Sequence, residues 1–213
     1  AATSFLPLIL MPLFGLLDIE SVSANYMHPT VLLYMGGFLM ATGIEKWNLH
    51  RRIALNIINL LGTNLRKIVL GFILATGFLS MWISNSATAL MMLPIGLAVV
   101  NQFKVQLGSN QEHYASNLGK NIMLGIAYSA SIGGMATLIG TPTNSILVAV
   151  VKELYDYSIG FNDWFAFGLP LVIILLLVCW YFLVSLANPL PKSFDLKESK
   201  SIIINTKLII YVI

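Results

Sequence analysis

Five long stretches of the chain contain no Asp, Glu, Lys or Arg, and they restrict the fold more than any other feature of the sequence. They are Ala1–Leu17, Ser21–Ile44, Ile68–Phe103, Asn121–Val151 and Trp164–Pro191. A helix needs about 20 apolar residues to cross the hydrocarbon core of a bilayer. Only 10% of all residues are charged and 57% are hydrophobic, whereas about 25% are charged in a soluble domain. The sequence therefore predicts an all-helical integral membrane protein that contacts the lipid bilayer.

The longest stretch, Ile68–Phe103, has 36 residues. One helix of that length would extend about 54 Å, which is too long for one crossing and too short for two crossings and a loop. We therefore expect a re-entrant helical hairpin that enters and leaves the membrane by the same face. Ser21–Ile44 and Trp164–Pro191 have the length of one span each, and Ala1–Leu17 that of a shortened span.

The distribution of charge supports the hairpin. Glu45–Lys67 contains five basic residues and one acidic residue, whereas Asp18–Glu20 and Lys152–Asp163 together contain five acidic residues and one basic residue. Basic loops are typical of the cytoplasmic side. All but one of the lysines and arginines lie on that side only if Ile68–Phe103 crosses the membrane an even number of times. Glu45–Leu61 has a helical apolar period and is predicted to lie on the cytoplasmic surface, with a connecting loop as the alternative.

Polar side chains interrupt the middle of the predicted hairpin. They are Ser80, Ser84, Asn85, Ser86 and Thr88. Backbone at the turn of a hairpin inside a membrane is tolerated only within protein or beside a water-filled cavity. Hydroxyl, amide and carbonyl oxygens at such a turn suit a small cation, and the N-terminus of the returning helix suits an anion. The alternative is that these side chains only form hydrogen bonds with a neighbouring helix.

A second apolar segment is interrupted at "SASIGGMATLIGTPTN", Ser129–Asn144. Gly133-Gly134 and Gly140-Thr141-Pro142 should each weaken or break a helix. Two interrupted apolar segments in one chain indicate the binding site of a secondary transporter near the middle of the membrane. Glycines that only allow close helix packing are the alternative, which accounts well for Gly36-Gly37 and poorly for Gly-Thr-Pro-Thr-Asn.

Several other functions have no motif in the chain. No P-loop, dinucleotide-binding glycine pattern or nucleophile elbow occurs, so we do not expect an enzyme. His28, His50 and His113 have no partner at metal-ligand spacing, and the single cysteine, Cys179, lies in an apolar run. The basic residues form no patch for nucleic acid. No signal peptide is visible, and the first residues look like the start of a fragment.

Three motifs resemble those of the divalent anion/sodium symporter family, which carries dicarboxylates, citrate and sulfate. They are "GGFLMATGIEKWNLHRRIAL", "SMWISNSATALMMLP" and "SASIGGMATLIGTPTN", in that order along the chain. The similarity extends roughly from Leu6 to Ser199. It implies a homodimer in which each full-length subunit contains two inverted repeats, each with a re-entrant hairpin and a broken helix. It also implies an elevator movement of a transport domain against a scaffold.

The resemblance also implies binding residues, position by position. Ser80, Ser84, Asn85 and Gly133 would bind sodium. Ser84, Asn85, Ser86, Thr141 and Pro142 would face the dianionic substrate. The chain has Ser-Asn-Ser where the family has Ser-Asn-Thr, and Gly-Thr-Pro-Thr-Asn where the family has Gly-Thr-Pro-Pro-Asn. At the first difference Ser86 keeps the hydroxyl but lacks a methyl group, which puts the substrate preference in question.

The predicted organisation has three parts, which form one half of an inverted-repeat transporter. They are scaffold helices and a surface helix (1–66), a transport region (67–191) with the hairpin (68–103), the broken helix (121–151) and a further span (164–191), and an atypical cytoplasmic tail (192–213). The predicted function is sodium-coupled symport of small divalent anions across the plasma or inner membrane by a multi-pass protein. A sodium-independent oxyanion permease and a truncated fragment without transport remain alternatives.

Overall fold

The computed structural model describes residues 2–27, 29–49, 52–53, 56, 64–107 and 112–191. Within these residues every regular element is helical and no strand occurs, which confirms the predicted all-helical class. The elements are η1 (Ala2–Phe5), α1 (Leu6–Leu13), α2 (Ile19–Tyr26), α3 (Pro29–Lys46), α5 (Leu65–Ser80), α6 (Asn85–Leu107), α7 (Glu112–Gly134), α8 (Pro142–Tyr155), α9 (Phe161–Phe182) and a π-helical turn η3 (Leu183–Ala187).

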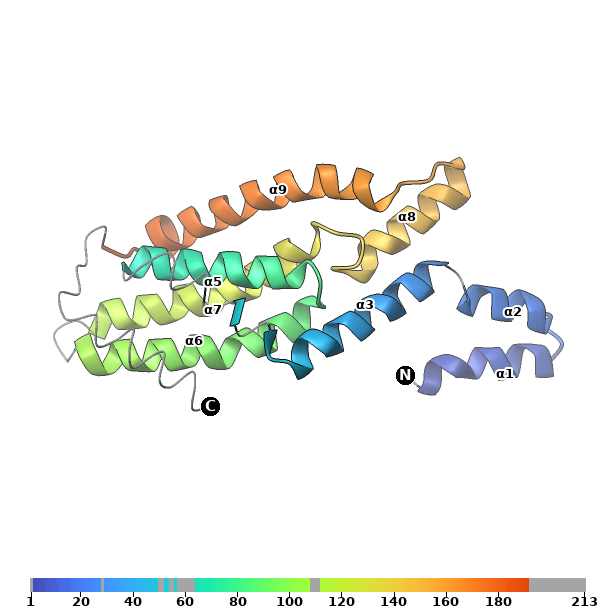
Figure 1. Cartoon of the computed structure of the whole chain (residues 1–213), viewed down its shortest axis with the longest axis horizontal. Helices are drawn as coiled ribbons and strands as arrows, with labels where there is room; N and C mark the ends of the chain where they lie inside the picture. Colours follow the sequence, from blue (N-terminus) through green and yellow to red (C-terminus); the bar gives the residue numbers. More distant parts are fainter. Residues whose placement is uncertain are drawn as a thin grey trace.

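Helices α5 and α6 form an antiparallel hairpin (Figure 1), as the length of the charge-free stretch predicts. The turn occupies residues 81–84, so Asn85 begins the returning helix and does not lie at the centre of the turn. The turn lies on the N-terminal side of Asn85 because Ser84 caps α6 and the helix begins at the next residue. Its hydroxyl accepts a hydrogen bond from the Ala87 N–H at 3.4 Å, and its carbonyl accepts one from the Thr88 N–H at 2.9 Å.

Helix α7 packs against both arms of the hairpin and forms the core with them (Figure 1). Phe72, Met92, Leu118 and Ile122 are completely buried there. Small residues allow the helices to approach closely, which is how helices associate in membranes. At Gly133 the approach is closest, because a Cβ atom there would overlap the backbone of Gly77 on α5.

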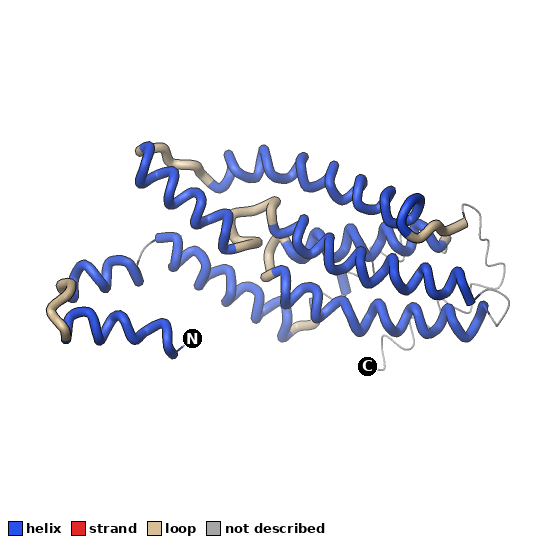
Figure 2. Tube along the Cα trace, turned by 180° about the vertical axis from the view of Figure 1, so that it is seen from behind, coloured by secondary structure: helices blue, strands red, loops and turns tan. Residues whose placement is uncertain are grey.

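The segment after α7 is interrupted where the glycines and proline predict. Helix α7 ends at Gly134, residues 135–141 are not helical, and α8 begins at Pro142 (Figure 2). Thr141 has extended backbone angles (φ −144°, ψ 141°) and is the N-cap of α8. Proline is well suited to the first position of a helix because the missing N–H has no partner there.

The helix α9 with its extension η3 is the one described helix that is long and apolar enough by itself to cross a membrane, over 27 residues from Phe161 to Ala187. The single span predicted for Ser21–Ile44 is divided instead, since α2 ends at Tyr26 and α3 begins at Pro29. Proline lacks the N–H that a continuous helix would need at that position. The two helices meet the length criterion only when they are taken together as one bent span.

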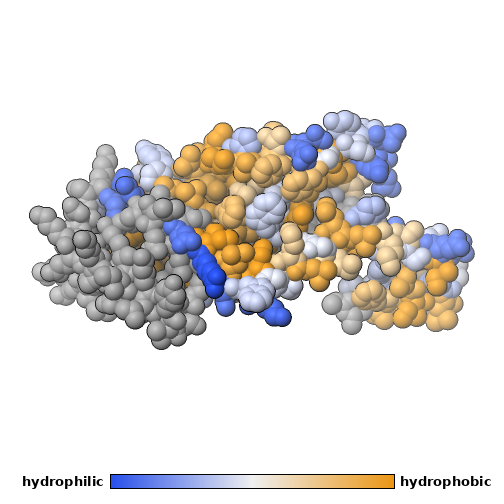
Figure 3. All heavy atoms as spheres, viewed as in Figure 1, coloured by the Kyte–Doolittle hydropathy of each residue, from blue (hydrophilic) through white to orange (hydrophobic). Residues whose placement is uncertain are grey.

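Large apolar side chains are exposed along α9. They are Phe167, Leu171, Ile173, Ile174, Leu177, Val178, Tyr181 and Phe182. In Figure 3 hydrophobic residues cover much of the visible bundle, and hydrophilic residues gather at the connection between α8 and α9. An apolar surface this extensive is typical of contact with lipid or another protein. The helix or loop predicted for Glu45–Leu61 falls partly outside the described residues, and the tail 192–213 falls wholly outside them.

Candidate functional site

Four helix ends meet where the hairpin turn lies against the interruption between α7 and α8 (Figure 1). The C-terminal ends belong to α5 and α7, and the N-terminal ends belong to α6 and α8. Hydrogen bonds join the two interruptions, because the Thr137 hydroxyl donates to the Met81 carbonyl oxygen at 2.5 Å and accepts from the Gly140 N–H at 3.0 Å. Helix C-termini carry partial negative charge and N-termini partial positive charge. One small region therefore offers surfaces for both a cation and an anion.

Oxygen atoms converge around the side chain of Asn85. Its Oδ1 lies 2.8 Å from the Ser80 hydroxyl, 3.1 Å from the Ala130 carbonyl oxygen and 3.3 Å from the Gly140 carbonyl oxygen. The Ser80 hydroxyl also lies 2.5 Å from the Ala130 carbonyl oxygen. That hydroxyl has one hydrogen to donate and the carbonyls have none. In this orientation the oxygens outnumber the available hydrogens, so the opposite orientation of the amide satisfies these atoms better.

The Asn85 amide offers a second way to satisfy the same atoms. If it turns by 180°, its NH2 group donates to Ser80, Ala130 and Gly140 over the same distances. An amide has an acceptor on one side and two N–H donors on the other, whereas an ionised carboxylate only accepts and a hydroxyl donates a single hydrogen. Asn85 can thus present oxygen to a cation or hydrogen to the carbonyls.

The interruption itself is held in shape by buried polar groups. The Asn144 amide donates to the Gly134 carbonyl at 3.0 Å and to the Thr137 carbonyl at 2.8 Å. The Ser145 hydroxyl donates to the Leu138 carbonyl at 2.7 Å. These bonds satisfy carbonyls at and after the end of α7 that have no partner within a helix. Buried carbonyls without hydrogen bonds would lower the stability of the fold. The Gly140 carbonyl is therefore presented to Asn85 by a fixed loop.

The structure brings part of the predicted sodium-binding set together. Ser80 is completely buried and touches Asn85. Gly133 is buried at the contact with Gly77, and a Cβ atom at its neighbour Gly134 would overlap the Asn85 Oδ1. Ser84 has its hydroxyl at the cap of α6.

The residues predicted to face the substrate lie around the two helix N-termini. Ser84 and Asn85 are half-buried, whereas Ser86 is exposed in the first turn of α6. Thr141 and Pro142 begin α8, and the Thr141 hydroxyl lies 3.4 Å from that of Thr143.

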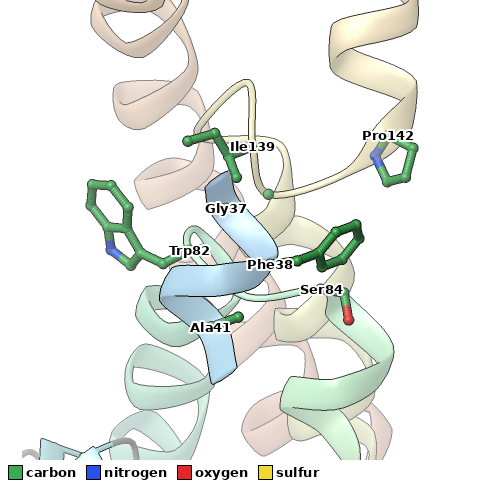
Figure 4. A pocket seen from close by; sticks show the side chains of 8 residues that line it. Gly37, Phe38, Ala41, Trp82, Ser84, Ile139 and Pro142 are labelled. Carbon is green, nitrogen blue, oxygen red and sulfur yellow. The ribbon is translucent and has the colours of Figure 1, made fainter. Parts of the chain in front are cut away.

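A pocket opens beside the hairpin turn, between it, the interruption and α3 (Figure 4). The space between its lining residues is about 320 Å³, a figure that includes open solvent. Its lining residues are Gly37, Phe38, Ala41, Trp82, Ser84, Ile139, Gly140 and Pro142. In Figure 4, Ile139 lies next to Gly37, while Phe38 and Ser84 lie on the side opposite Trp82. Ser84 and Pro142 are the residues of the predicted substrate set that line it.

Sequence reasoning missed the carbonyl groups of Ala130 and Gly140 and the hydroxyl of Thr137. A carbonyl is present in every residue, so no letter of the sequence marks the ones that meet Asn85. Thr137 is visible in the sequence, because it is a polar residue between the Gly133-Gly134 pair and Gly140 in an apolar segment.

Comparison with known proteins places the chain among transporters. The family model described as "Citrate transporter" matches residues 1–212. A "Sodium-dependent dicarboxylate transporter SdcS" of Staphylococcus aureus (strain USA300) is 44% identical over 184 residues, which cover 86% of this chain and 35% of the relative. The protein of the same name from Staphylococcus saprophyticus is 42% identical over 206 residues, which cover 94% of this chain and 40% of the relative.

The chain thus spans between about a third and two fifths of the length of these relatives. The matched family is one of transporters and not of enzymes, in agreement with the lack of catalytic motifs, and its members are integral membrane proteins. The predicted resemblance is therefore confirmed: the chain belongs to the citrate transporter family.

Proposed function

We propose that this chain forms part of a secondary transporter that couples the movement of Na⁺ to that of a small divalent anion such as a dicarboxylate or citrate. The oxygen cluster at Asn85 carries the proposal, because it provides neutral oxygen ligands next to two helix N-termini. The names of the relatives, sodium-dependent dicarboxylate transporters, support the same pair of substrates.

In this proposal the cation binds among Ser80, Ser84, Asn85 and the Gly133 region. Unwound carbonyls and the C-terminal ends of half-helices coordinate Na⁺ in other transporters with broken helices. The carbonyls of Ala130 and Gly140 are the groups of this kind that face Asn85. The described residues contain no group of three or more His, Cys, Asp or Glu side chains that could hold a metal ion, and the proposed ligands are neutral oxygens.

The anion is proposed to bind at Ser84, Asn85, Ser86, Thr141 and Pro142. The first turns of α6 and α8 contain no acidic residue that would repel a dianion. Their positive helix ends favour a carboxylate. This half-site contains no Lys or Arg among the proposed residues, so bound Na⁺ would supply the positive charge nearest to the substrate.

Coupling follows from the position of Asn85 between the two sites. A cation that holds the amide with Oδ1 inward would turn the NH2 group away from Ala130 and Gly140, so that it could donate to a carboxylate of the substrate. Without the cation the NH2 group is engaged by Ala130 and Gly140. Each ligand then favours the conformation that the other one needs, which is the thermodynamic requirement for coupling.

We further propose the division into scaffold residues 1–66 and transport residues 67–191. Helices α1 to α3 lie beside the bundle of α5, α6, α7 and α9 in Figure 2, and this separation supports it. By family resemblance, the full-length protein is proposed to be a multi-pass homodimer of the plasma membrane, with an inverted second repeat and an elevator movement of residues 67–191.

Uptake by the full-length protein in proteoliposomes tests this function. Labelled succinate, citrate and sulfate are offered with an inward gradient of Na⁺ or of K⁺. Uptake of at least one dianion that requires Na⁺ is expected. Equal uptake with K⁺ would favour the sodium-independent permease, and no uptake under either gradient would contradict transport of these anions.

A further inference from the structure

Helix α3 comes close to the interruption at Gly37. A Cβ atom at Gly37 would lie 2.5 Å from the Cγ2 of Ile139, whereas carbon atoms in van der Waals contact lie about 3.5–4.0 Å apart. The neighbouring Gly36 has nothing within 4 Å of the same position. Of the two adjacent glycines, only Gly37 is needed for the approach of α3 to Ile139.

This contact forms one edge of the pocket at the hairpin turn. Gly37 and Ile139 both line the pocket, together with Ser84 and Pro142 at the two helix N-termini. The distance between α3 and the interruption therefore helps to set the width of the pocket (Figure 4). Most of the lining is apolar, so this wall would face the carbon skeleton of a substrate and not its charges.

We propose that Gly37 is a positioning residue that sets the size of the dianion accepted at this site. It acts through Ile139: the absence of a side chain at Gly37 lets α3 rest on the interruption and narrow the pocket. This inference deepens the proposed function and rests on it, and it assigns part of the substrate selectivity to a helix outside the two interrupted segments.

An added methyl group at Gly37 would have to move α3. Cγ2 is bonded directly to the Cβ of Ile139, so rotation about the outer bond of the side chain does not remove it from the contact. A β-branched side chain also has few alternative rotamers. With the helix moved outward, the pocket is wider than in the unmodified protein. A longer dianion then binds more nearly as well as a shorter one. One methylene group in a binding pocket changes discrimination by about 10- to 200-fold.

The test compares Gly37→Ala with its matched control Gly36→Ala in the full-length protein. The KM ratio for a six-carbon and a four-carbon dicarboxylate is measured in proteoliposomes, with the Na⁺ concentration for half-maximal uptake and the melting temperature in parallel. Gly37→Ala is expected to shift the KM ratio about tenfold toward the longer dianion without changing the Na⁺ requirement. Gly36→Ala should leave the KM ratio as it is.

Two further variants make the result specific to the contact. Ile139→Leu removes Cγ2 and should restore the original KM ratio in the Gly37→Ala background. Ile139→Ala alone lets α3 settle closer and should shift the ratio toward the shorter dianion, which tests the inference even if Gly37→Ala does not fold. An unchanged ratio in Gly37→Ala and Ile139→Ala would overturn the inference. Lack of Na⁺-dependent uptake by the unmodified protein would instead overturn the proposed function.

Discussion

At the scale of single residues, the amide of Asn85 has the largest share in the proposed mechanism. Oxygen atoms of Ser80, Ala130 and Gly140 surround it, and the amide can turn either its NH2 group or its oxygen toward them. A residue of this kind is useful to a symporter because the ion-free state must also be stable. Otherwise the empty carrier could not return across the membrane.

Asn85→Ala removes the proposed ligand without adding charge. A hydrogen bond or polar contact to a charged group contributes about 1.5–3 kcal/mol, so we expect Na⁺ to bind about 10- to 100-fold more weakly. Thermal stability of the full-length protein as a function of NaCl concentration measures this. Asn101→Ala, at an exposed position of the same helix, is the control. An unchanged Na⁺ dependence in Asn85→Ala would limit Asn85 to a packing role.

Ser86→Thr adds one methyl group at the position where the chain departs from its family's motif. Because the hydroxyl remains, a contact with a carboxylate should persist, while the preference among dianions of different size changes by up to about 10- to 200-fold. Sodium affinity should stay nearly the same. Competition between a short and a long dianion, beside a melting curve, separates selectivity from stability. A changed melting temperature with unchanged preference would remove Ser86 from the proposed substrate site.

At the scale of helices, the hairpin and α7 hold the site together through close backbone contact. Gly133 lies against the Gly77 backbone one turn from the end of α5. The same packing brings the Ala130 carbonyl to within 2.5 Å of the Ser80 hydroxyl. The oxygen cluster therefore depends on two helices approaching more closely than side chains would allow.

Gly133→Ala tests whether that residue acts through packing. The added methyl group would overlap the Gly77 backbone, which cannot rotate away, and overpacking of a core costs about 1–3 kcal/mol. We expect a lower melting temperature together with weaker Na⁺ binding. Gly43→Ala, where nothing lies within 4 Å of the added atom, should have neither effect. If stability stays normal and only Na⁺ binding weakens, the residue contributes as a ligand and not through packing.

At the scale of the whole molecule, both ends of the hairpin lie at one end of the bundle, and the connection between α8 and α9 lies at the other end (Figure 1). Lys67 and Lys104 are exposed near the start of α5 and the end of α6, and Asp156 is exposed just after α8. Basic residues near one end and acidic residues near the other agree with a cytoplasmic face for the hairpin.

Cysteine accessibility in cells tests this orientation. In a Cys179→Ala background, single cysteines replacing Lys67 and Lys104 should react with a membrane-impermeant reagent only after the cytoplasmic face is opened. A cysteine replacing Asp156 should react in intact cells. Labelling of the Lys104 position from outside would contradict the re-entrant hairpin and the site that depends on it.

The helical class, the hairpin and the position of the interruption follow from the order of the amino acids alone. These features depend on local properties: the length of a charge-free stretch against the thickness of a bilayer, and the inability of Gly-Gly and Gly-Thr-Pro to continue a helix. The polar group from Ser80 to Ser86 was also visible, because hydroxyls and an amide are conspicuous in an apolar segment.

Which atoms meet in the candidate site depends on the three-dimensional packing of the helices. The carbonyls of Ala130 and Gly140 reach Asn85 from 45 and 55 residues away along the chain, and a carbonyl has no signature in the sequence. The same holds for Gly37 and Ile139, since the two adjacent glycines of α3 look equivalent until the neighbouring segment is placed. Contacts between distant segments depend on how the helices pack, and packing is a property of the assembled fold.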